Sequence, residues 1–123
     1  MKKLNLYIIE KLRINKNTKV YDYEKVIKLI KEMLNYIFSP KCTNSFYKND
    51  KLNDKFFEFN VDNNWIYMKC TDDFFKKYKA SDSYNIFCLL AEYKKDFGFE
   101  NLSISRRESD CMFIFRNWKF KDE

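Results

Sequence analysis

Few side chains in this sequence could carry acid, base or phosphate chemistry. The nearest approach to a carboxylate motif is Asp72-Asp73, and the 123 residues include no histidine. Without histidine, Ser-His-Asp and Cys-His nucleophile pairs and zinc sites with imidazole ligands are excluded. Gly98 is the only glycine, so a glycine-rich loop around a phosphate is excluded as well.

The acids and thiols that remain predict structural roles. Neighbouring carboxylates such as Asp72 and Asp73 point apart, and at a helix N-terminus they interact favourably with the macrodipole. The four cysteines include no C-x-x-C pair, which argues against a metal cluster and favours reduced thiols. We expect Cys88 on an apolar helix face and Cys111 on a strand. The sequence therefore predicts no enzyme: no catalytic residue, metal, cofactor or small-molecule substrate.

Charge gives a stronger indication. The formal net charge is +6, and residues 1–50 hold eleven Lys/Arg against five Asp/Glu, while the rest nearly balances. Such asymmetry favours an acidic partner: nucleic acid, a ribonucleoprotein or a negative protein surface. The alternative is a lysine-rich surface encoded by an AT-rich genome. The candidate contacts are cations of the N-terminal half and one later pair: Lys2, Lys3, Lys11, Arg13, Lys16, Lys19, Lys25, Lys28, Arg106 and Arg107.

Basic and aromatic residues also interleave near the C-terminus. Arg106 and Arg107 are expected in a hairpin turn, and residues 116–121 combine cations with Trp118 and Phe120. Guanidinium groups can fork onto phosphates, and exposed aromatic rings can stack on bases. The alternative is that both rings hold the C-terminus on the core, because tryptophan is highly buried on average.

Hydrophobic spacing predicts the helices that would position these residues. Residues 4–13 have helical spacing, and a second helix begins near Asp22 with a continuous apolar stripe. Ser39-Pro40 ends it, because proline disfavours the helical conformation in the residue before it. A short helical turn follows Thr71 or Asp72, and a longer helix is capped by Ser81 or Asp82 and ends at Gly98.

Alternating residues predict four strands in two hairpins. The first joins residues 57–61 to 65–70 through Asp62-Asn63-Asn64, and the second joins the strand that begins at Leu102 to residues 111–116. The order predicts an α+β fold: two N-terminal helices, then two antiparallel β-hairpins separated by a helix. We expect a single two-layer domain over 1–123, with a basic leader helix and loop (1–19) and a body (20–123). No stretch is apolar enough to span a bilayer, which predicts a cytoplasmic protein without membrane contact.

The leader carries a resemblance. Its pattern is Leu4-x-x-Tyr7-Ile8-x-Glu10-Lys11-Leu12-x-Ile14-Asn15-Lys16-x-Thr18-Lys19. This opening resembles that of many short accessory proteins from bacteriophages and prophages of Bacteroidota, which share it over different bodies. The resemblance covers about sixteen residues and includes no catalytic residue. It implies a phage context and a host-takeover or anti-defence role, such as that of an anti-CRISPR protein against an RNA-targeting (type VI-B-like) effector.

Three binding hypotheses follow. The first is a viral inhibitor that occludes the protein or guide-RNA surface of a CRISPR ribonucleoprotein in the host cytoplasm. The second is a free-standing RNA- or DNA-binding accessory protein. The third is a virion-packaged structural protein whose leader is a routing signal. The +6 charge departs from the acidic nucleic-acid mimicry of many anti-CRISPR proteins, so contact with RNA or a ribonucleoprotein is favoured. The sequence leaves the oligomeric state open.

Overall fold

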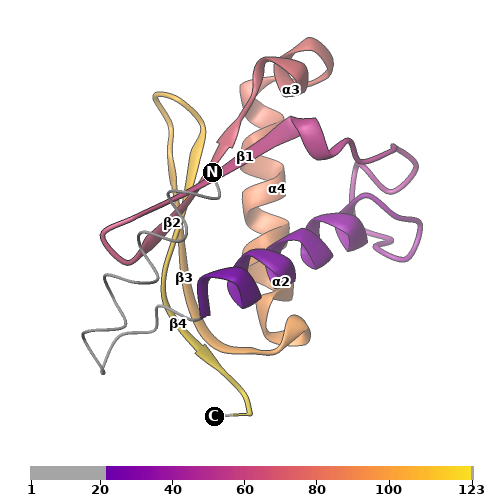
Figure 1. Cartoon of the computed structure of the whole chain (residues 1–123). Coiled ribbons are helices and arrows are strands. Elements are labelled where there is room, and N and C mark those ends of the chain that lie inside the picture. The colour runs from indigo at the N-terminus through magenta and orange to yellow at the C-terminus, as the bar shows by residue number, and fades with distance from the viewer. Residues whose placement is uncertain (1–21, 123) are drawn as a thin grey trace.

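The chain folds into helices and one antiparallel sheet (Figure 1). The computed structural model describes residues 22–122, so the helix expected over 4–13 lies outside them. In chain order the elements are α2 (Asp22–Ile37), η1 (Asp54–Phe56), β1 (Phe57–Asp62), β2 (Trp65–Cys70), α3 (Asp72–Lys77), α4 (Ala80–Tyr93), η2 (Lys94–Phe97), β3 (Phe99–Arg107) and β4 (Met112–Phe120). The α+β class is confirmed, as are the two hairpins.

The two hairpins join into one sheet. The strand order is β1-β2-β4-β3, and every neighbouring pair is antiparallel. The joint lies between β2 and β4, where Met68 pairs with Phe113 and Ile66 with Phe115. These four side chains are fully buried, so the hydrophobic alternation of each strand fixes the register of the joint. Strands β1 and β3 are the two edges of the sheet.

Helices α2 and α4 lie on the same side of this sheet (Figure 1). The stripe predicted on α2 is confirmed, with Val26, Ile30 and Met33 completely buried. On α4, Ile86 and Leu90 are also completely buried. Each such aliphatic side chain stabilises the fold by roughly 1.5–3 kcal/mol relative to exposure. One continuous core therefore forms between the helices and this side of the sheet.

Local sequence sets the element ends. Asn63 and Asn64 both have positive φ, 52° and 67°, as the two-residue turn of a tight hairpin requires. Thr71, one of the two predicted caps, caps α3 by accepting a hydrogen bond from the backbone N–H of Phe74. Gly98 has a φ of 98° and ends η2, the short 3-10 extension of α4, which confirms its helix-stopping role.

The start of α4 differs from the prediction. The N-cap is Lys79 rather than Ser81 or Asp82. The Asp82 carboxylate lies one turn inside the helix and accepts a hydrogen bond from the Lys79 backbone N–H at 2.8 Å. It also accepts one from the Tyr47 hydroxyl at 2.7 Å. The acid thus satisfies a free N–H of the first turn from the third helical position instead of the cap.

A bulge in β4 decides where the C-terminal aromatics point. Asn117 has a φ of 56°, and the pairing register with β3 shifts by one residue at this point. The extra residue keeps Trp118 and Phe120 on the helix side, where they are 4% and 2% exposed. Trp118 packs edge-on against Tyr23, with ring centroids 5.5 Å apart. The alternative prediction, that these two rings hold the C-terminus on the core, is therefore confirmed.

Candidate nucleic-acid interface

The second side of the sheet has no described helix packed on it. Its side chains come from the positions that alternate with the core residues. One row runs across all four strands in register, from Asn60 through Tyr67 and Ile114 to Ser105. We call this surface the open face and define it by its aromatic, apolar and basic side chains on β2, β3 and β4: Trp65, Tyr67, Lys69, Arg107, Ile114 and Arg116.

Two aromatic rings lie together on the open face. Trp65 and Tyr67 are two residues apart on β2, and their ring centroids are 6.3 Å apart. Both side chains are only partly buried. The guanidinium of Arg116 lies over the Trp65 ring, 4.8 Å from its centroid. Such a contact holds the cation beside the ring and stabilises the pair by about 0.5–1 kcal/mol at an exposed site.

Charge is unevenly distributed across this face. The outward positions of β1 carry Glu58 and Asp62, whereas the cations Lys69 and Arg116 lie on β2 and β4. No ion pair within residues 22–122 involves Lys69 or Arg116. An anionic ligand would therefore be favoured along β2 and β4 and disfavoured at β1.

The structure separates Arg106 and Arg107, which the sequence predicted as a pair in a hairpin turn. Both lie in β3 instead, where successive side chains point to opposite sides. Arg106 points to the helix side: its Nε donates to the Ser83 hydroxyl at 3.0 Å, and its Nη2 donates to the Ala80 carbonyl at 3.3 Å. It fastens the start of α4 to the sheet.

Arg107 belongs to the open face. Its Nε and Nη2 donate to the two carboxylate oxygens of Asp110, at 3.0 and 2.7 Å. Hydrogen bonding to Asp110 is the main cause of the raised pKa of Arg107, and Tyr67 also contributes to it. The same hydrogen bond lowers the pKa of Asp110. A phosphate would have to compete with Asp110 for this arginine.

The other predicted cations lie elsewhere. Lys25 and Lys28 are exposed on α2. The Lys25 ammonium lies 4.0 Å from the Phe120 ring centroid and 3.8 Å from the Asp122 carboxylate. Phe120 lies at one end of β4, and Met112, the pairing partner of Arg107, lies at the other end. Lys25 is therefore about 25 Å from Arg107 along the strand. The remaining predicted cations, Lys2, Lys3, Lys11, Arg13, Lys16 and Lys19, lie outside the described residues.

Most of the net charge of +6 lies in the N-terminal residues. Residues 1–21 hold six Lys/Arg and one Asp/Glu, so +5 of the net charge of +6 lies there. The rest of the chain is nearly neutral. Long-range attraction to an anion would therefore come from the N-terminal residues, and contact specificity from shape and rings.

The predicted thiols and acids show no catalytic arrangement in the described residues. No group of His, Cys, Asp or Glu within 22–122 could hold a metal ion. Burial raises the pKa of the Cys70 thiol to about 12, which keeps it protonated and weakly nucleophilic. Cys88 is exposed rather than on an apolar face, and Cys111 lies in the turn before β4 with a φ of 55°.

Sequence reasoning missed Trp65, Tyr67 and Lys69 as candidate site residues. Their alternation with Ile66, Met68 and Cys70 was visible, but it did not show which set points outward. The signal was the lysine, since a charged residue in the alternating set marks the solvent side of a half-buried strand.

No protein-family model, curated protein or solved structure shows significant similarity to the chain. Among the helices that the structure describes, none has the length and apolar character that a membrane crossing would need.

Proposed function

We propose that the protein is a binding protein whose ligand is single-stranded RNA, and that the open face carries the contact. The observation that carries the proposal is the pair of neighbouring rings, Trp65 and Tyr67, with Arg116 stacked on the first of them. Unpaired bases stack on aromatic rings and on guanidinium planes, and sheet surfaces with two or three such rings are a common platform for RNA.

Stacking also suits the weak charge of the body. Each stacked base contributes about 1–3 kcal/mol and does not depend on a dense array of cations. Lys69 and Arg116 supply the local positive charge along β2 and β4. The acids of β1 repel the RNA phosphates from that edge of the sheet. The six cations of residues 1–21 would add sequence-independent attraction to phosphates.

The biological setting proposed with this activity is inhibition of an RNA-guided defence nuclease. The leader supports it through its resemblance to phage and prophage accessory proteins. An inhibitor that stacks on exposed bases of a guide or target RNA would occlude a CRISPR ribonucleoprotein without catalysis. The host cytoplasm is then the site of action.

The direct test measures binding of fluorescent single-stranded polyuridine RNA by anisotropy, at low and at physiological salt. Trp65→Ala and Tyr67→Ala should each weaken binding by roughly five- to 150-fold, which corresponds to the loss of one stacked base. Phe46→Ala is the matched control, because Phe46 is 79% exposed on the loop after α2 and belongs to no strand.

Two outcomes would contradict the proposal. One is the absence of RNA binding by the wild-type chain even at low salt. The other is equal binding by wild type, Trp65→Ala and Tyr67→Ala, which would assign RNA to the N-terminal cations alone. Capture of a CRISPR ribonucleoprotein from host lysate by wild type but not by the Trp65→Ala, Tyr67→Ala double variant would support the inhibitor role.

A further inference from the structure

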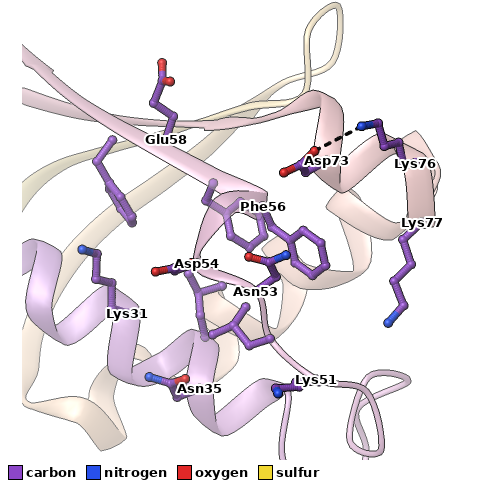
Figure 2. A pocket seen from close by; sticks show the side chains of 14 residues that line it. Lys31, Asn35, Lys51, Asn53, Asp54, Phe56, Glu58, Asp73, Lys76 and Lys77 are labelled. Carbon is purple, nitrogen blue, oxygen red and sulfur yellow. Dashed lines mark hydrogen bonds and ion pairs between the residues drawn. The ribbon is translucent and has the colours of Figure 1, made fainter.

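A groove of about 1300 Å³ lies on the helix side of β1. Its walls come from α2, η1 with the loop before it, β1 and α3, as Figure 2 shows. Its apolar lining residues, which we call the floor, are Leu34, Leu52, Phe56, Phe57 and Phe59, and the other lining residues are polar or charged. It shares none of the residues that define the open face.

One wall of the groove is the edge strand of the sheet, because β1 pairs with β2 on one side only. Asp62 and Trp65 flank the two-residue turn. In such a hairpin the two flanking residues form a hydrogen-bonded pair, in which each backbone N–H donates to the carbonyl of the other residue. Bonded and non-bonded pairs alternate along an antiparallel ladder. Phe59, which is opposite Met68, therefore turns its backbone N–H and C=O outward.

These backbone groups have no hydrogen-bond partner among residues 22–122. The neighbouring outward N–H, that of Val61, is satisfied by the Asn60 side-chain oxygen at 3.0 Å, which blunts that end of the edge. At Phe59 the donor and the acceptor are both available. Such a pair recognises one chemistry well: the backbone of another extended chain.

The charges of the groove indicate which extended chain fits. Lys31, Lys51 and Lys77 line it, and Lys31 lies 5.5 Å from the Phe59 ring centroid. Asp73 is occupied by an ion pair with Lys76 at 3.5 Å. Glu58 also lines the groove, and its side chain points upward from β1 in Figure 2. The three lysines then face two carboxylates without an ion pair within residues 22–122, those of Asp54 and Glu58, so the excess charge of the groove is positive and favours an acidic ligand.

We propose that this groove binds an extended acidic segment of a partner protein, which adds a strand to the free edge of β1. The backbone of the segment pairs with Phe59, and its apolar side chains alternate into the floor beside the phenylalanine rings. Its carboxylates meet the lysines of the rim. The site goes beyond the proposed RNA contact and stands without it.

The experiment selects peptides from a random display library on the full-length protein. Enriched sequences should alternate apolar with acidic residues, and one synthetic consensus peptide is then measured by calorimetry. Phe59→Pro removes the outward N–H, a change that an edge strand tolerates, and Phe59→Ala is its matched control because both variants lack the ring. The peptide should bind Phe59→Pro about tenfold more weakly than Phe59→Ala.

A second variant guards against misfolding of the proline variant. Lys51→Glu with Lys77→Glu changes two exposed side chains, and it should weaken peptide binding at least as strongly while weakening RNA binding less than Trp65→Ala does. Conversely, Trp65→Ala should leave peptide binding unchanged, so failure of the groove and failure of the open face are distinguishable. The proposal is overturned if no peptide is enriched, or if the enriched peptides bind the proline, alanine and glutamate variants equally.

Discussion

The two sides of the sheet use the same strands for opposite purposes. On the helix side, Phe113 and Phe115 of β4 are completely buried against α2 and α4. On the open face, Ile114 and Arg116 of the same strand are only partly buried. Alternating side chains thus give stability to one side and leave rings and cations available on the other. The open face, which we propose binds RNA, therefore results from the alternation of side chains along each strand. The core on the other side of the sheet holds that surface rigid.

The largest effect should come from the helix side. Phe113→Ala removes a fully buried ring and should cost about 3–5 kcal/mol of unfolding free energy, measured by urea denaturation. Its neighbour provides the control, since Ile114→Ala on the open face should cost only about 1 kcal/mol. Equal costs for the two variants would show that the two sides are not different in kind.

The second-largest effect should come from alkaline pH, which lowers the free energy of unfolding through buried tyrosines on the helix side. Burial raises the pKa of Tyr23 to about 12 and also raises those of Tyr47 and Tyr78. In the unfolded chain these phenols ionise near pH 10. Because the folded state binds the proton more tightly, the stabilisation is complete below about pH 10 and is lost as pH rises toward about 12.

This loss should reach about 2 kcal/mol for Tyr23 alone, measured by urea unfolding across that pH range. Tyr23→Phe is the control, because it removes the ionising hydroxyl and the hydrogen bond to the Asn64 side chain at 3.0 Å. That variant should be less stable at neutral pH and less sensitive to alkali. An unfolding free energy that stays constant up to pH 12 would contradict the assignment.

The smallest effect should come from Arg116. Arg116→Lys keeps the charge but loses the planar group stacked on Trp65, so RNA affinity should fall by about two- to fivefold with little change in stability. Lys28→Ala removes a whole charge from α2, outside the open face, and should weaken RNA binding less. If Lys28→Ala has the larger effect, the contact is electrostatic and lies on the helices.

Much of the fold followed from local sequence. The α2 stripe, the Asn63-Asn64 turn, the Thr71 cap and the Gly98 stop each depend on residues close in the chain, and each is confirmed. The joint between β2 and β4 depends on residues some 45 positions apart, and no local pattern specifies such a pairing. The bulge at Asn117 was equally invisible, although it decides that Trp118 is core.

The site was predicted less well than the fold, for a related reason. Arg106 and Arg107 are adjacent in sequence, but a strand sends them to opposite sides, and Arg106 is used to fasten α4. Trp65 and Arg116 are far apart in sequence, and only the β2–β4 pairing brings the ring and the guanidinium together. Composition located the excess charge, whereas strand pairing located the rings.

The most direct test of the central claim is a titration of isotope-labelled protein with short single-stranded RNA, followed by backbone and indole NMR shifts. The open face predicts that the largest shifts fall on the Trp65 indole and on residues of β2 and β4 whose side chains point away from the helices. Shifts confined to the outer surfaces of α2 and α4, with the Trp65 indole unmoved at saturation, would contradict it.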